Sequence, residues 1–320
     1  MRQETAAFSS ALLAFAEAHP EVVTLSADLG DSCELIGFRT RYPERYFHMG
    51  IAEQNMVSWA AGLAREGFRP VVCTFGVFLY RRALDQIEMS LASSRLPVIL
   101  VGFVPGLTTS RGRTHQAIND VGVLRTIPGL TIIDCGDATE VAGALEAAYA
   151  VDGPVYIRML RGCVPRIFDG VAPFELGRSR ELDGGLERGV SEQEPQVTLV
   201  SSSICTAEAL PVVAKLRAEG IRIRHIHVST LKPFGDALLL DALANAECGI
   251  VTYENHSVVG GLGSATAELL LERGIAKPLI RLGIPDTYAQ SGSLPYLLST
   301  YGMDAAALED SIHDLVARGS

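Results

Sequence analysis

The stretch that decides the fold runs from His48 to Ala64 and reads HMGIAEQNMVSWAAGLA. Its first residues include a glycine, Gly50, and the stretch contains a single carboxylate, Glu53. Small and apolar residues at helical spacing follow Glu53. We therefore expect a helix from Ala52 to Glu66 with Glu53 in its first turn. The helix dipole stabilises a carboxylate at that place, so a charge or cap at the helix start explains Glu53 when it is taken alone.

Segments on both sides of this helix alternate between two patterns. Short β-branched runs flanked by turn residues predict buried strands, and longer stretches with a 3.6-residue period predict helices. Such alternation predicts a mainly parallel sheet that is covered on both faces. The other elements expected in the first half are the strands Val22–Ser26, Val71–Thr74, Val98–Val101 and Leu130–Ile133 and the helices Thr5–Ala18, Arg82–Ser93 and Ala138–Ala150.

Proline, glycine and charge interrupt the alternation between Cys163 and Gln196, as expected of a linker. We predict two consecutive α/β domains with mainly parallel sheets, at residues 1–165 and 197–320, joined by a linker at 166–196. The amides that start the helix after the glycine-rich run Val258–Ser264 are suited to accept an anion. The elements expected in the second half are the strands Val197–Ser201, Arg222–Val228 and Gly249–Thr252 and the helices Thr206–Glu219, Gly235–Asn245 and Ala265–Arg273.

Composition narrows the classes of function. The 320 residues carry a net charge of -10, which repels nucleic acid at long range. The longest apolar runs, such as Leu96–Val104, fall short of the roughly 20 residues that span a bilayer. The N-terminal residues lack the apolar stretch of a signal peptide, so we expect a cytoplasmic protein with no membrane partner. The six cysteines show no C-x-x-C pair and no zinc-like spacing with histidine, and we expect core thiols.

Motifs along nearly the whole chain resemble the transketolase family in order and spacing. Those of the first half are similar to the family's pyrimidine-binding domain, and those of the second half to its C-terminal domain. The resemblance implies the corresponding subunit of a split transketolase, related to deoxyxylulose-phosphate synthases and to the β subunits of 2-oxoacid dehydrogenases. The matching motifs are GIAEQNM at Gly50–Met56, AAGLA at Ala60–Ala64, Phe75, Asp85-Gln86, GRTHQAIND at Gly112–Asp120, Lys232-Pro233 and GGLGS at Gly260–Ser264.

The resemblance also implies a thiamine-diphosphate site. Glu53 matches the glutamate that hydrogen-bonds the aminopyrimidine ring and favours its imino tautomer, which makes Glu53 the first catalytic candidate. Phe75 and Phe78 match aromatics that stack on that ring, although core packing also explains Phe78. Asp28 matches an aspartate close to the cofactor, or caps an Asx turn. Arg82 is assigned to the same cofactor site, in a stretch one residue longer than the family pattern.

Substrate contacts are implied in the same way. His115, in Thr-His-Gln, matches a substrate-facing histidine, and imidazole suits proton transfer because it titrates near neutrality. A hydrogen-bonded loop histidine is the structural alternative. Arg2, Ser32 and Arg161 match positions that contact a sugar phosphate, which implies a phosphorylated or otherwise anionic sugar substrate.

The chain departs from the family pattern in its substrate loop. Transketolases carry Gly-x-Asp-Gly before Thr-His, whereas Arg111 stands at the aspartate position here. Phe103 occupies the place expected for a second histidine. Because a guanidinium pairs with carboxylate, phosphate or sulfonate, we hypothesise that Arg111, with Arg113, recognises an anionic or keto-bearing acceptor. A solvated loop arginine is the alternative.

No Gly-Asp-Gly motif occurs in the sequence. The family uses that motif to bind the Mg²⁺ that anchors the diphosphate, so the resemblance implies that the metal ligands come from a second, diphosphate-binding subunit in an α2β2 heterotetramer. We expect no metal ligand in this chain.

Three other interpretations stay open. One is a carboligase or decarboxylase of the deoxyxylulose-phosphate synthase or 2-oxoacid dehydrogenase β type. Another is a non-catalytic regulatory subunit with the same fold, against which the presence of Glu53, Phe75 and His115 argues. A nucleotide-dependent oxidoreductase is disfavoured because the glycines near Gly260 lack G-x-G-x-x-G spacing after a strand.

Overall fold

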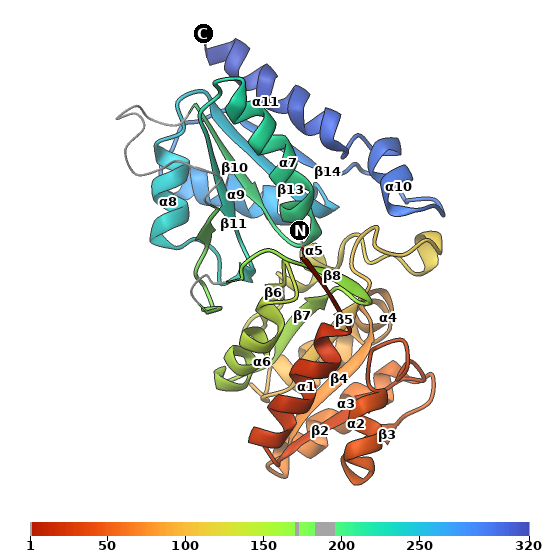
Figure 1. Ribbon diagram of the computed structural model, residues 1–320. Helices are drawn as coiled ribbons and strands as arrows, with labels where there is room; N and C mark the ends of the chain where they lie inside the picture. The colour runs from red at the N-terminus through yellow and green to blue at the C-terminus, as the bar shows by residue number, and fades with distance from the viewer. Residues whose placement is uncertain (1, 170–172, 183–195, 320) are drawn as a thin grey trace.

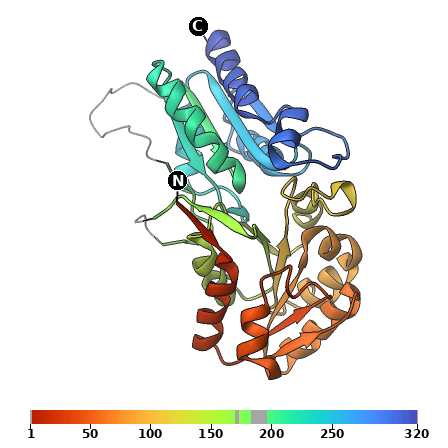
Figure 2. The same ribbon diagram turned by 45° about the vertical axis from the view of Figure 1, so that its right-hand side comes forward.

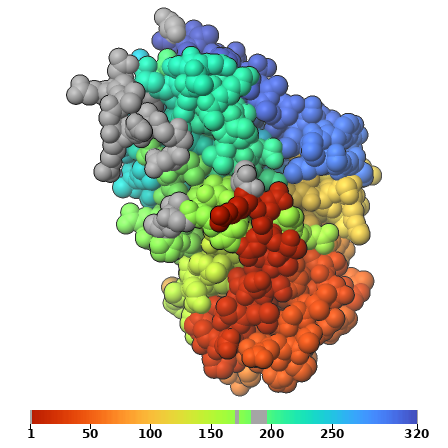
Figure 3. All heavy atoms as spheres, in the orientation of Figure 1, coloured from red at the N-terminus to blue at the C-terminus, as the bar shows by residue number. Residues whose placement is uncertain are grey.

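The computed structural model describes residues 2–169, 173–182 and 196–319. Two sheets organise these residues, one in each half of the chain, and Figures 1 and 2 show the two halves as adjoining lobes. Both sheets are mainly parallel and carry helices on their faces, which confirms the predicted α/β class. In the space-filling view the lobes are in direct contact (Figure 3).

The first lobe is built on a seven-stranded sheet. Its strands are parallel except β12, which comes from the second half of the sequence and pairs antiparallel with β6. The parallel strands end at one common edge, where open α/β sheets place their ligands. In order across the sheet, the strands are β12 (Thr230–Lys232), β6 (Thr131–Asp134), β7 (Val155–Met159), β5 (Ile99–Phe103), β4 (Arg69–Phe75), β2 (Val22–Ser26) and β3 (Tyr46–His48).

Helices α1 (Ala7–Ala18), α2 (Ile36–Arg41) and α6 (Glu140–Ala150) form one packed group in this lobe. A second group contains α3 (Glu53–Arg65), α4 (Gly76–Arg82) and the π-helix η2 (Gln86–Ala92), and α5 (Asp120–Leu124) packs against α4. Short 3-10 turns, η1 (Pro43–Arg45) and η3 (Gly112–Thr114), complete the lobe.

The single helix predicted at Arg82–Ser93 is wrong. Helix α4 ends at Arg82, the helical conformation is interrupted at Ala83, and the π-helix η2 follows from Gln86. Each π-turn holds one residue more than an α-turn. The break lies in the stretch before Asp85-Gln86, where the extra residue relative to the family pattern is expected, and the π-turns begin only at Gln86.

The second lobe is built on a five-stranded sheet. The edge strand β9 pairs antiparallel with β11, and the other strands are parallel. Helices α7 and α11 pack on strand β13, which lies next to the edge strand β14, and α9 packs on β13 and β14. The strands, in order, are β14 (Leu279–Ile284), β13 (Gly249–Ser257), β10 (Val197–Ser201), β11 (Ile223–His227) and β9 (Arg180–Glu181), and the helices are α7 (Ile204–Ala218), α8 (Ala237–Ala244), α9 (Leu262–Glu272), α10 (Leu294–Thr300) and α11 (Ala305–Gly319).

Two strands border or lie in the predicted linker. The strand β8 (Cys163–Arg166) pairs antiparallel with β1 (Arg2–Thr5), and the two lie side by side in Figures 1 and 2. Strand β9 joins the second sheet. The rest of the expected linker, at 170–172 and 183–195, lies outside the described residues.

A buried ion network joins the two lobes. The guanidinium of Arg158, at the end of β7, pairs with Asp120 and Asp134 at 2.9 Å each. It also donates to the backbone oxygen of Asn255 in β13, and Ser202 of the second lobe donates to Asp134. One guanidinium thus serves two buried carboxylates, and burial raises the pKa of Asp134. The hydrogen bonds from Arg158 to Asn255 and from Ser202 to Asp134 hold the lobes in a defined relative position.

Candidate active site

Glu53 is the first residue of α3, and its side chain is only 3% exposed. Its carboxylate accepts a hydrogen bond of 2.7 Å from Arg82 at the end of α4, whose side chain is 44% exposed. Both residues, with Arg81 and the first turn of α3, line an open pocket of about 540 Å³. The predicted catalytic carboxylate is thus nearly buried, and the hollow in front of it is open to solvent.

Aromatic rings lie next to the ion pair of Glu53 and Arg82. The Arg82 guanidinium lies 4.1 Å from the centre of the Phe78 ring, a cation–π distance. Phe78 stacks on Phe75 with centroids 5.7 Å apart, and the His115 ring meets Phe78 edge-on at 5.3 Å. Four residues that are distant in sequence therefore form a continuous chain of contacts from Glu53 to His115.

His115 is half-buried at the end of the short turn η3. Burial lowers the pKa of its imidazole, and the nearby cations Arg111 and Arg82 lower it further. Its Nδ1 is 2.9 Å from the hydroxyl of Thr114, which leaves the other ring nitrogen available to a ligand. An imidazole in this environment stays neutral to lower pH than a free one and is suited to accept a proton.

Asp28 lies just beyond the carboxyl end of β2 and is exposed. It adopts the left-handed conformation, with φ at 59°, which is uncommon for a residue other than glycine. Its carboxylate bonds the Nε2 atom of His48 at 3.0 Å, a partner that the sequence pattern did not reveal. The pair stands at the sheet edge near the start of the segment that leads to Glu53.

The predicted phosphate contacts are only partly brought together. Arg161 donates to the backbone oxygen of Ser32, and its guanidinium lies 5.5 Å from the centre of the Phe75 ring. Arg2 lies opposite Arg166 in the two-stranded sheet of β1 and β8, and Thr5 lies opposite Cys163 at its other end, which is close to Arg161 in sequence. About three strand residues, or roughly 10 Å, separate Arg2 from that end. Arg161 therefore borders the aromatic pair and is joined to Ser32, whereas Arg2 lies at the other end of the two-stranded sheet.

Arg111 and Arg113 lie beside a different pocket. This hollow of about 400 Å³ is formed by the loop at 111–114 and by Tyr288, Gln290 and Ser291 of the second lobe. Both arginine side chains are exposed, and neither has an ion-pair partner among the residues that the structure describes. The pocket is thus lined by two cations that are free to meet an anion.

Phe103, at the place where the family has a second histidine, is fully buried and packs on Phe8 with centroids 5.2 Å apart. One expectation from the sequence, the anion site at the helix after the glycine-rich run, needs correction. The helix after the glycine-rich run starts at Leu262, and its first amides are already occupied. The buried Glu254 carboxylate accepts hydrogen bonds from the amides of Leu262 and Gly263 at 2.6 and 2.8 Å. The expected anion site is therefore filled by the chain itself.

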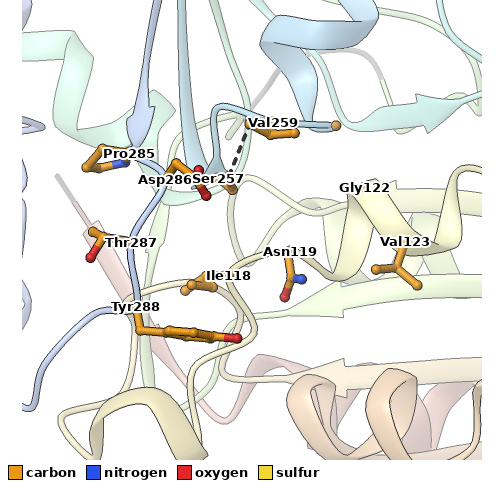
Figure 4. Close-up of a pocket in the computed structure, with 11 residues that line it drawn as sticks. Ile118, Asn119, Gly122, Val123, Ser257, Val259, Pro285, Asp286, Thr287 and Tyr288 are labelled. Carbon is orange, nitrogen blue, oxygen red and sulfur yellow. Dashed lines mark hydrogen bonds between the residues drawn. The ribbon is translucent and has the colours of Figure 1, made fainter.

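A further pocket, of about 420 Å³, lies between the lobes. Figure 4 shows Asn119 on one side and Thr287 and Tyr288 on the other. Asn119 accepts a hydrogen bond from Tyr80, whose hydroxyl in turn accepts one from Arg81. Tyr80 and Asn119 therefore connect this pocket to the Glu53 site, and neither was singled out from the sequence because each resembles an ordinary packing residue.

The described residues contain no group of three or more histidine, cysteine, aspartate or glutamate side chains placed to hold a metal ion. No helix in the described part of the chain is long and apolar enough to cross a membrane.

Comparisons with known proteins agree with this architecture. Residues 2–166 match the transketolase pyrimidine-binding domain, and residues 188–308 match the transketolase C-terminal domain. A putative uncharacterized transketolase family protein, y4mN, from Sinorhizobium fredii is 40% identical over 97% of this chain and 88% of its own length. The 6-deoxy-6-sulfo-D-fructose transketolase subunit SqwH of a Clostridium species is 37% identical, covering 96% and 92% of the two chains.

Among solved structures, a split-gene transketolase described as an inactive β4 tetramer superposes with a TM-score of 0.85. It is 35% identical in sequence, and the match covers 98% of both chains. The match therefore includes both lobes and their relative placement. By fold, by sequence and by the order of its two domains, the chain belongs to the transketolase family and is similar to the subunit of a split transketolase.

Proposed function

We propose that this chain is the pyrimidine-binding subunit of a thiamine-diphosphate-dependent split transketolase. It transfers a two-carbon ketol unit from a ketose to an aldehyde or keto acceptor that carries an anionic group. The observation that carries the proposal is the cluster of Glu53, Arg82, Phe78 and His115, which combines a nearly buried carboxylate, an aromatic platform and a neutral imidazole.

Residues of the cluster fit an aminopyrimidine ring. Arg82 already presents a flat group that donates to Glu53 at 2.7 Å and covers the Phe78 ring at 4.1 Å. An aminopyrimidine is also flat and carries donors, so it suits the same two contacts. Arg82 then leaves Glu53 and stays at the rim of the pocket as a cofactor-binding residue, with Asp28 nearby at the sheet edge.

Thiamine diphosphate supplies a nucleophilic carbon and an acceptor for the electron pair when the carbon–carbon bond of a ketose breaks. Glu53 orients the aminopyrimidine by hydrogen bonding and holds a proton at its carboxylate, while Phe75 and Phe78 stack on the ring. His115 accepts the hydroxyl proton of the donor as the bond breaks and returns a proton to the acceptor oxygen. Its lowered pKa keeps it ready to accept that proton near neutral pH.

A partner subunit supplies the diphosphate and Mg²⁺ ligands in this proposal. Support comes from the missing Gly-Asp-Gly motif and from the lack of a metal-binding cluster among the described residues. The similar split transketolase that forms a β4 tetramer is inactive, as expected of subunits assembled without such a partner. We infer an α2β2 heterotetramer in which the open face of the Glu53 pocket meets the partner.

An anionic acceptor is supported by the cations around the site. Arg111 and Arg113 line one pocket, and Arg161 lies near the aromatic pair. Guanidinium groups bind phosphate and sulfonate well because their donors match the oxygens of such groups. The similarity to a subunit that acts on a sulfo-sugar favours a sugar phosphate or sugar sulfonate as substrate.

Reconstitution tests the proposal. The chain is mixed with a Gly-Asp-Gly-containing transketolase subunit, thiamine diphosphate and Mg²⁺, and ketol transfer is followed from a ketose phosphate to aldehydes with and without an anionic group. We expect activity only in the mixture and a preference for anionic acceptors. Full activity of the chain alone, or an active Glu53→Gln mixture, would contradict the proposal.

A further inference from the structure

A loop from the second lobe lies directly on the loop that carries Arg111 and His115. We name residues 109–116 the acceptor loop and residues 285–292 the C-terminal loop. Figures 1 and 3 show the yellow segment of the first lobe against the blue segment that leads into α10. The backbone amide of Gly292 donates to the oxygen of Ser110 at 3.2 Å, which joins the two loops directly.

Gln116 makes the most central contact between these loops. Its side chain is fully buried, and its Nε2 atom donates both to Thr109 O at 3.2 Å and to Gln290 O at 3.3 Å. One amide group thereby closes the acceptor loop on itself and fastens it to the C-terminal loop. Removing this amide would take one hydrogen bond from each of the two backbone acceptors and would break both links at once.

Close packing reinforces this contact at Gly112, in the middle of the acceptor loop. A Cβ atom at Gly112 would lie 2.7 Å from the hydroxyl of Ser291, and the backbone there has a φ of 72°. Only glycine combines that conformation with so close an approach. The two loops are therefore fitted to each other beside Arg111 and Arg113.

The C-terminal loop is itself anchored. The backbone amide of Gln290 donates to the hydroxyl of Tyr301 at 2.8 Å, and its side-chain amide donates to the hydroxyl of Tyr296 at 2.7 Å. Tyr296 belongs to α10 and Tyr301 follows its last residue. The acceptor loop is thus held in place by the C-terminal loop, which is itself bound to helix α10 of the second lobe and to the residue after it.

We propose that the C-terminal lobe determines acceptor selectivity, with Gln116 as the positioning residue that holds Arg111 and His115 in place. The inference rests on the proposed function and assigns a role to the lobe that carries none of the cluster around Glu53. Tyr288 and Ser291 complete the pocket that Arg111 and Arg113 line, so the acceptor's anionic group is bound between the two lobes.

The substitution Gln116→Met tests the proposal because it keeps the length of the side chain and removes both donors. Trypsin cleaves after arginine, and exposed Arg111 and Arg113 report directly on the loop. We expect roughly tenfold faster cleavage after these two residues in the full chain, since each hydrogen bond lost favours local opening. Gln196→Met is the matched control: Gln196 accepts from the amide of Arg222 at 3.1 Å, in the second lobe away from the loops.

The second readout is acceptor kinetics in the reconstituted mixture. Gln116→Met should raise the KM for an anionic acceptor roughly tenfold, whereas the KM for an acceptor without an anionic group should change less. Tyr301→Phe removes the hydroxyl that accepts from the backbone amide of Gln290 in the C-terminal loop. It should raise both the trypsin cleavage rate and the KM for the anionic acceptor, each by a smaller factor.

Unchanged trypsin cleavage at Arg111 and Arg113 would overturn the positioning role, whether or not the enzyme is active. Faster cleavage with an unchanged KM for the acceptor would overturn the link to selectivity. If the wild-type mixture transfers no ketol unit, the proposed function fails along with the selectivity role, and the cleavage rates still decide whether Gln116 holds the loop.

Discussion

Two glutamates lie beside two helix starts in this molecule, and their surroundings differ. Glu254 is 1% exposed, and its carboxylate accepts the amides of Leu262 and Gly263 at the start of α9. Glu53, 3% exposed, begins α3 and takes one side-chain hydrogen bond, from the half-exposed Arg82. The first carboxylate is satisfied by two backbone amides, and the second by the end of one long, half-exposed side chain.

This difference separates a structural carboxylate from a candidate catalytic one. Burial and placement at a helix start are shared by both residues and do not distinguish them. What distinguishes them is the replaceable partner and the pocket of about 540 Å³ in front of Glu53.

Glu53→Gln should reduce ketol transfer in the reconstituted mixture by roughly 10²- to 10⁴-fold, the usual contribution of a positioned acid or base. The amide keeps the size of the side chain and removes the charge that orients the ring. Steady-state kinetics measures the loss, and thermal unfolding should show little change because the partner of Glu53, Arg82, is half-exposed and their ion pair adds little stability. Wild-type rates in this variant would remove Glu53 from the mechanism.

Arg111→Asp should reverse acceptor preference by roughly 10- to 100-fold, as expected when one charge-assisted hydrogen bond is lost. Like Glu53, Arg111 has a charged group that no backbone group holds, and among the described residues its guanidinium has no ion-pair partner. Relative kcat/KM values across acceptors with phosphate, sulfonate or no anionic group check the effect. Unchanged ratios would show that Arg111 is only a solvated loop residue.

Glu254→Gln is the matched change on the structural side of the comparison. We expect a loss of roughly 1–3 kcal/mol in the free energy of unfolding, because an amide nitrogen would replace one acceptor facing a buried N–H. Denaturant titration measures this loss, while ketol transfer per folded subunit should stay near that of the wild type. A large loss of activity without loss of stability would contradict the structural role of Glu254.

The smallest expected effect concerns pH. Burial and the charges of Arg111 and Arg82 lower the pKa of His115, so its neutral form persists below the ordinary range of histidine. Removing one of those charges with Arg111→Leu should raise this pKa and move the acid limb of kcat/KM to higher pH. The pH profile checks it, with Arg113→Leu as a control that should leave the limb in place. A shift to lower pH would contradict the assignment of His115 as the proton acceptor.

Much of the fold followed from the sequence because its strands are short, β-branched and evenly spaced. Strand β2 was predicted at its exact bounds, Val22–Ser26, and so was β10, Val197–Ser201. Strand β7 and the elements after α9 were not identified, since β7 contains Arg158 and Tyr156 and lacks the expected pattern. Both side chains are buried, and the arginine is held by carboxylates from other elements that no local pattern reveals.

The candidate site was predictable where one residue carries a motif and not where a contact joins distant segments. Glu53 and His115 lie in recognisable motifs, and their proximity through Phe78 agrees with the geometry expected of one site. The roles of Gln116 and the C-terminal loop depend on contacts across 174 residues of chain. Phe103, which stands where the family has a second histidine, lies in the core, and the sequence alone did not show what that replacement does.

The most direct test of the account is calorimetric titration with thiamine diphosphate and Mg²⁺. The titration is made on the chain alone, on the chain with a Gly-Asp-Gly-containing partner, and on the same mixture with Glu53→Gln or Glu254→Gln. We predict binding only when the partner is present, weakened by Glu53→Gln and unaffected by Glu254→Gln. Tight, metal-dependent binding to the isolated chain, or equal affinity in the Glu53→Gln mixture, would contradict the claim that Glu53 serves an active site completed by a second subunit.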